Sequence, residues 1–135
     1  MTLTAEDRAT LARLAALMVP GGAGMPSAAR ISLQGAPLDR VLAHAPQLSG
    51  PLGRFCAAAR DVADMAGLDA AAQADRDGFE ALAVAVGNAY FMAPQVRHAI
   101  GYPGQEARDA SVGLTAGDQA LLTPVWQRGR LWRAP

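Results

Sequence analysis

Lysine is absent from this sequence: all 12 basic residues among its 135 residues are arginine. The chain therefore has neither the amine of a Schiff-base enzyme nor the P-loop lysine that binds nucleoside triphosphates. Its single cysteine, Cys56, cannot form an intramolecular disulfide. Twelve acidic residues balance the arginines, and this zero net charge argues against a surface built to bind nucleic acid.

Long apolar runs are missing as well. No segment approaches the roughly 20 residues that span a membrane. The first ten residues, MTLTAEDRAT, lack the basic region and apolar stretch of a secretory signal. We therefore expect a cytoplasmic protein with no direct membrane span. The alternative is a periplasmic protein whose partner carries the export leader or whose own leader was removed.

The motifs of common catalytic sites do not occur either. His44 and His98 have no metal-ligand spacing with Cys56 or with a neighbouring carboxylate. There is no C-x-x-C-H haem attachment motif and no G-x-S-x-G nucleophile motif. We expect no catalytic residue, no metal and no cofactor in this chain.

What the sequence does contain is the pattern of a small helical protein. A chain of 135 residues fits one ordinary domain. Apolar residues recur at helical spacing, and no segment alternates as a strand does. The predicted fold class is all-α: a single small domain of about five helices, with a long Gly/Pro-rich loop over 19–37 and an irregular C-terminal tail. The predicted helices cover residues 5–19, 37–45, 51–66, 75–91 and 93–100, with Gly67 as the stop of the third.

Several polar and aromatic residues fall within these helices. Cys56 lies on an apolar face and is predicted to pack as a small hydrophobic residue. The segment 75–91 is apolar nearly all round, which predicts a helix buried at the centre of the bundle. Asn88 would then be a hydrogen-bonded polar group of the core. On the same reading, Tyr90 and Phe91 are core aromatic residues.

The C-terminal segment differs in composition from the rest. After Asp118 there is no acidic residue, whereas both tryptophans and three arginines lie here. Trp and Arg are enriched among the residues that dominate binding energies. The expected organisation is a helical domain over 1–118 and a Trp/Arg tail over 119–135 that docks on a partner. The alternative is a tail that folds back over its own bundle and covers the Phe79–Tyr90 helix.

Two segments resemble a known protein family. LTAEDRATL at 3–11 is followed by a helix and a Gly-rich loop, and YFMAPQV at 90–96 leads into IGYPGQ at 100–105. Together, residues 3–108 resemble the gluconate 2-dehydrogenase subunit 3 family, most strongly over 88–105. Its members are small, helical, non-catalytic subunits of flavin-dependent dehydrogenases of the glucose–methanol–choline type.

The resemblance implies a division of labour. A large partner subunit would hold FAD and oxidise a hydroxyl group of a sugar, polyol or related alcohol. This chain would bind that partner and support its folding, stability or export in a hetero-oligomer. Some such complexes add a cytochrome that accepts the electrons. Many members carry a twin-arginine leader, and this sequence has no twin arginine, which puts the membrane cytochrome in doubt.

The expected function is therefore that of a non-catalytic small subunit of a FAD-dependent alcohol or sugar dehydrogenase. The alternative is a free-standing helical interaction or regulatory module, without a dehydrogenase partner, that binds a peptide or a small ligand. The residues expected to contact the partner lie in the second resembling segment and in the tail. They are Tyr90, Phe91, Pro94, Tyr102, Pro103, Trp126, Arg128, Arg130, Trp132 and Arg133.

Overall fold

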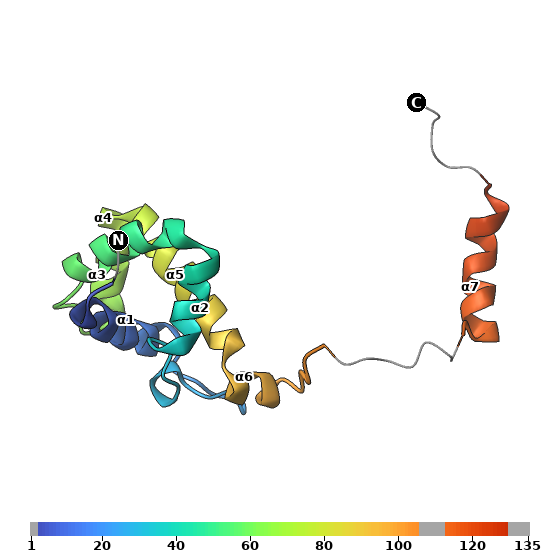
Figure 1. Ribbon diagram of the computed structural model, residues 1–135, viewed down its shortest axis with the longest axis horizontal. Helices are drawn as coiled ribbons and strands as arrows, with labels where there is room; N and C mark the ends of the chain where they lie inside the picture. Colours follow the sequence, from blue (N-terminus) through green and yellow to red (C-terminus); the bar gives the residue numbers. More distant parts are fainter. Residues whose placement is uncertain (1–2, 106–112, 130–135) are drawn as a thin grey trace. The chain divides into compact units, whose positions relative to one another are not determined.

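The computed structural model describes residues 3–105 and 113–129 of the chain (Figure 1). These residues form seven α-helices, two short 3-10 helices and one isolated bridge between Gly22 and Met25, with no strand. The all-α fold class is confirmed, with seven helices where about five are expected. The helices are α1 (Ala5–Met18), η1 (Ala28–Arg30), α2 (Ala36–His44), η2 (Pro46–Leu48), α3 (Ser49–Ala58), α4 (Met65–Ala74), α5 (Arg76–Met92), α6 (Pro94–Ala99) and α7 (Ala116–Gln127).

Helix α1 begins as its sequence predicts. The Thr4 hydroxyl accepts a hydrogen bond from the Asp7 N–H at 3.1 Å, and the Asp7 carboxylate accepts one from the Thr4 N–H at 3.0 Å. This capping box satisfies N–H groups that the first turn leaves without partners. Farther along α1, Leu11 and Leu14 are completely buried, and the helix packs against η1 and α3.

The first unit, Met1–Gly104, is built around α5, its longest helix with 17 residues. Helices α2, α3, α4 and α6 all pack on α5. Leu82 and Val86 of α5 are fully buried, and the Phe79 ring lies 6.0 Å from that of Phe55 in α3. At Gly78, an added Cβ would lie 2.9 Å from the Phe55 Cβ, so α3 can approach α5 closely only because this residue is glycine.

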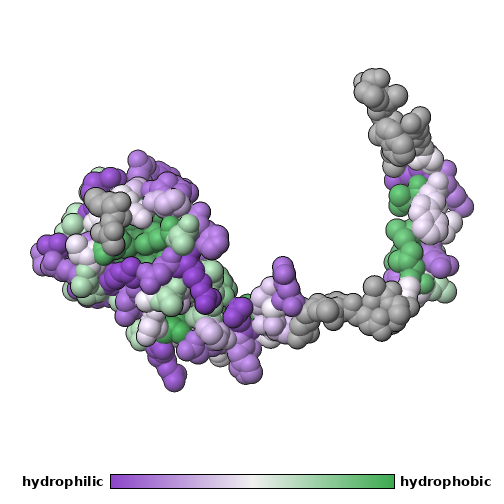
Figure 2. Space-filling model, viewed as in Figure 1, coloured by the Kyte–Doolittle hydropathy of each residue, from purple (hydrophilic) through white to green (hydrophobic). Residues whose placement is uncertain are grey.

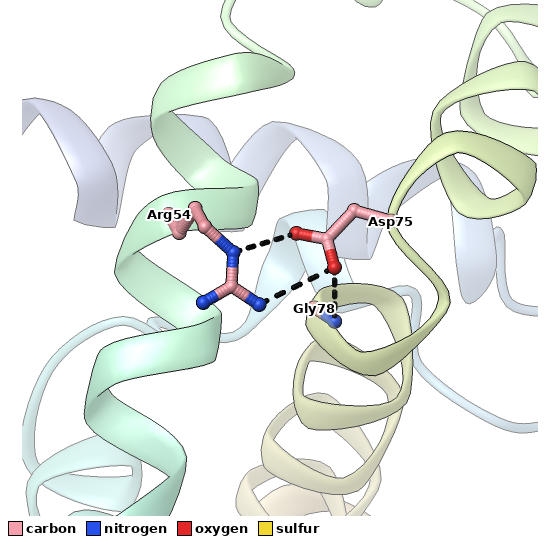
Figure 3. A network of polar contacts seen from close by, with 3 residues as sticks. All are labelled: Arg54, Asp75 and Gly78. Atoms are coloured by element: carbon pink, nitrogen blue, oxygen red, sulfur yellow. Dashed lines mark hydrogen bonds and ion pairs between the residues drawn. The ribbon is translucent and has the colours of Figure 1, made fainter.

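The carboxylate of Asp75 joins α3 to the start of α5 (Figure 3). It caps α5 by accepting a hydrogen bond from the Gly78 N–H at 3.0 Å. It also accepts hydrogen bonds from Arg54 of α3, from Nε at 3.1 Å and from Nη2 at 3.3 Å. The hydrogen bond from Arg54 and then that from Gly78 lower the pKa of Asp75 below its ordinary value.

The single helix predicted over 51–66 is wrong in its C-terminal half. Helix α3 ends at Ala58, and the Arg13 guanidinium donates hydrogen bonds to carbonyl groups of the turn that follows, including Val62 at 3.2 Å. These carbonyl groups therefore need no further helical turn to be satisfied. Asp64 then caps α4 by accepting from the Gly67 N–H at 2.8 Å, so Gly67 lies in the first turn of a helix and is not a stop.

The second unit, Gln105–Pro135, contains α7. The tail expected to be irregular from residue 119 is helical as far as Gln127. A capping box begins α7, because the Asp118 N–H donates to the Thr115 hydroxyl at 3.2 Å and the Thr115 N–H donates to the Asp118 carboxylate at 2.9 Å. The hydrogen bonds from Thr115 lower the pKa of Asp118. The units divide between Gly104 and Gln105, before the expected boundary at 118/119.

Replacing Asp75 with Asn keeps a capping side chain but removes the charge that Arg54 binds. Because the folded-state pKa of Asp75 lies below 3.8, the ionised carboxylate stabilises the fold above that pH, and its contribution is lost as the pH falls through the folded pKa. We expect Asp75→Asn to melt at a lower temperature than the wild type at neutral pH, with a difference that shrinks as the pH falls through the folded-state pKa. Thermal unfolding followed by circular dichroism measures both; a difference that persists unchanged in acid contradicts this role of the charge.

Candidate partner-binding surfaces

Tyr90 and Phe91 are neighbours that the fold uses differently. Tyr90 is 5% exposed, and its hydroxyl donates a hydrogen bond to the Pro26 carbonyl oxygen at 2.6 Å, which fastens the Gly-rich loop to α5. Phe91 is 57% exposed. Consecutive residues point about 100° apart around a helix, and only Tyr90 shares the inward face with Val86. The interpretation as a core aromatic is confirmed for Tyr90 and wrong for Phe91.

The segment that follows α5 also presents its predicted contact residues on the surface. Pro94 begins α6 and is exposed, and Tyr102 is 49% exposed. Gly101 and Gly104 both have positive φ, so they form the turn that this sequence indicates. Tyr102 and Pro103 line an open depression of about 270 Å³. All the predicted contact residues of the bundle except Tyr90 are thus accessible to a partner.

Helix α7 exposes an apolar face. Leu121 is 78% exposed, Trp126 is 60% exposed and Val125 is 47% exposed. Together with Leu122, they share one side of the helix, as their spacing requires. Green, hydrophobic surface is visible on this helix in Figure 2. No residue of α7 is buried. Arg128, just beyond the helix, is also exposed. Three further predicted contact residues lie outside the described residues: Arg130, Trp132 and Arg133.

The outward side of α5 is a surface that the sequence analysis misses. Val84 is 40% exposed, and the exposed side chain of Asn88 donates a hydrogen bond to the Val84 carbonyl oxygen at 2.9 Å. The expectation that α5 is buried all round, with Asn88 in the core, is therefore wrong on this side. The sequence gives no signal for this exposed side, because the segment from Ala81 to Val96 has no charged residue and is apolar nearly all round.

Polar groups inside the bundle serve its structure. Cys56 is completely buried, and burial, helped by the Asp7 charge, raises the pKa of its thiol to about 12. The thiol is therefore protonated at neutral pH, and the predicted role of Cys56 in core packing is confirmed. Within 3–105 and 113–129, no three His, Cys, Asp or Glu side chains gather as metal ligands would. None of the helices in these ranges is long and apolar enough to cross a membrane.

No family model, curated protein or solved structure matches this chain. The resemblance to the gluconate 2-dehydrogenase subunit 3 family stays a prediction. Three surfaces of the described residues are candidates for contact with a partner: the apolar face of α7, the exposed aromatic residues after α5, and the outward side of α5.

Tyr90 and Phe91 allow the structural and surface roles to be separated. Tyr90→Phe removes the hydroxyl that binds the Pro26 carbonyl oxygen and should lower the free energy of unfolding by about 1 kcal/mol. Phe91→Ser removes a ring that is 57% exposed and meets only the edge of a neighbouring ring, that of Tyr90 at 5.4 Å, so it should lower that free energy by less than Tyr90→Phe does. Urea unfolding of both variants measures the two effects. Equal destabilisation by the two variants would show that Phe91 belongs to the core.

Proposed function

We propose that this chain is a non-catalytic small subunit that binds and stabilises a larger FAD-dependent dehydrogenase acting on the hydroxyl groups of sugars or other alcohols. The observation that carries this proposal is the exposed apolar face of α7. A partner that covers this face would remove Leu121, Val125 and Trp126 from water. Burial of such side chains contributes roughly 25 cal/mol for each Å² of apolar surface.

The shortness of α7 favours a larger protein as its partner over a second copy of the same helix. Helices shorter than about 12–15 residues are marginal on their own in water, and α7 has 12 residues, none of them buried. A stable interface needs roughly 800 Å² and 20–30 residues from each partner, which two such helices cannot supply. A groove on a larger protein, in which α7 lies, would contact more of the helix surface than a second copy of α7 could.

The charge of the tail indicates what borders that groove. Arg128 follows α7 directly, and Arg130 and Arg133 come next in the sequence with no acidic residue after Asp118. Acidic groups on the partner would complement these arginines. Pairs at an exposed rim are screened by water, so they affect the rate of association and the register more than the affinity.

The family resemblance supports the identity of the partner. The most similar segment, 88–105, places Phe91, Tyr102 and Pro103 on the surface, where they contribute little to the chain's own core. Residues with this exposure and aromatic character are suited to contact another protein. In this proposal the FAD and the reacting groups belong to the large subunit, and this chain supplies binding surface.

A free-standing module that binds a peptide or a small ligand is the second candidate. It is favoured by an open depression of about 430 Å³ beside the Gly-rich loop, which Met25, Arg30 and Gln95 help to line. This volume lies within the range of small-molecule sites. The depression is open and its charged and amide side chains are exposed, so the accessory-subunit proposal remains the first candidate.

The experiment that tests the proposal is co-expression with candidate flavoprotein dehydrogenases of the source organism, beginning with any that is encoded beside this chain. We expect a yellow complex of fixed stoichiometry that reduces an electron-accepting dye when an alcohol or sugar is added, and a flavoprotein that melts at a lower temperature without this chain. Separate elution of the two proteins, with unchanged melting of the flavoprotein, would refute the proposed function.

Single substitutions in α7 test the contact itself. Trp126→Ala and Leu121→Ala should each weaken the complex by roughly tenfold or more, the loss expected when an anchor worth about 2 kcal/mol is removed. Gln127→Ala is the matched control, because Gln127 is exposed in the same helix but lies away from the apolar face. Dissociation constants from titration calorimetry report the effects. Wild-type affinity in both anchor variants would exclude α7 as the docking element.

A further inference from the structure

The outward side of α5 lacks the polar surface that a helix normally turns towards water. From Ala81 to Val96 the sequence contains no charged residue. A helix at the surface of a bundle usually carries charged residues opposite its buried stripe. Here, Val84 and Phe91 are instead 40% and 57% exposed. This side of α5 is therefore apolar where the fold of the first unit does not cover it.

Four residues on this side form a regular stripe, which we call the α5 outer face: Val84, Gly87, Asn88 and Phe91. Their spacing of i, i+3, i+4 and i+7 places them on one side of the helix. A Cβ added at Gly87 would meet no atom within 4 Å, so the middle of the stripe is open. Val84 and Phe91 flank this low point. A helix lying across it can bring its backbone close to α5 between two apolar side chains.

The α5 outer face adjoins a depression between α5 and α2. The depression has a volume of about 260 Å³, and Asn88 contributes to its lining together with Met92 of α5 and Val41 of α2. Most of its lining surface is apolar, and Arg40 and His44 of α2 also contribute to the lining. The neighbouring carboxylate, that of Asp39, forms an ion pair with Arg8 at 2.6 Å. Asp39 is therefore paired with Arg8 and not with Arg40.

We infer that the α5 outer face and this depression bind an α-helix of the same partner subunit that receives α7, with an acidic side chain of that helix facing Arg40. The inference rests on the proposed function and adds a second contact to it. The low point at Gly87 and the flanking Val84 and Phe91 suit a helix. The Arg40 guanidinium suits a carboxylate, because the two can form charge-assisted hydrogen bonds.

A second copy of this chain fits the same face less well. The four residues span only about two helical turns, far less than the roughly 800 Å² that each subunit of a stable dimer contributes. A small contact is nevertheless effective when the partner is already held elsewhere. Because the α5 outer face and α7 belong to one chain, binding at one raises the effective concentration for binding at the other.

The test is Gly87→Glu in the full chain, titrated with the flavoprotein subunit. The new side chain fills the low point of the stripe and repels an acidic helix, so we expect at least tenfold weaker binding. Because the added Cβ has free space and Glu is a good helix former, the melting temperature of the isolated chain should not fall. The matched control is Gly50→Glu, since Gly50 also lies in a helix with open space around an added Cβ, and this variant should bind like the wild type.

Arg40→Glu is an independent second variant that tests the charge without changing α5. It should slow association and make the rate less sensitive to salt. Wild-type binding by both Gly87→Glu and Arg40→Glu would overturn the inference, while weak binding by Trp126→Ala would still uphold the proposed function. A wild-type chain that sediments as a dimer, and a Gly87→Glu chain that sediments as a monomer, would also overturn it by assigning the face to a second copy.

Discussion

The inward face of α5 is the surface on which the bundle depends. Helices α2, α3, α4 and α6 each pack against it. Asp75 fixes its first turn to Arg54 of α3, and the Tyr90 hydroxyl fixes its last turns to the carbonyl group of Pro26 in the Gly-rich loop. Because α5 is held at both ends and along its length, its rotation about its own axis is fixed. The directions in which Val84 and Phe91 face follow from that constraint.

Because the rotation of α5 is fixed, its apolar residues are either buried against neighbouring helices or exposed on the outward side. Small residues such as Ala85 and Ala89 are buried and let the neighbouring helices approach closely. The Phe91 ring meets the Tyr90 ring edge-on at 5.4 Å between centroids, but it points away from the core and is 57% exposed. A helix that faced only water on this side would gain from charged residues there. In the proposed complex, this uncharged side would lie against the partner and not against water.

Local signals in the sequence predicted the parts of the fold that local hydrogen bonds decide. The start of α1 at Ala5 and the bounds of α5, which agree with the predicted 75–91 to within one residue, are of this kind. The break after α3 was not predictable in the same way, because it depends on Arg13, which lies far away in the sequence and binds the carbonyl groups of that turn. Helical periodicity also could not distinguish Tyr90 from Phe91, since an all-apolar helix does not reveal which side its neighbours cover. Helix α7 was missed because the prediction for the tail followed its Trp/Arg composition and not the Thr115–Asp118 pair that caps this helix.

The energetics of α7 tie its folding to its binding. Pro124 lies inside the helix and cannot donate the backbone hydrogen bond of that turn, whereas the capping box at Thr115 contributes about 1 kcal/mol. With no buried side chain, α7 has little else to offset the entropy of ordering its backbone. In the proposed complex, burial of Leu121 and Trp126 against the partner would supply the missing free energy, and part of it would be used to order the helix. The net affinity of α7 would then be smaller than its contact area suggests, so a partner held by α7 would gain much from a second contact on the bundle.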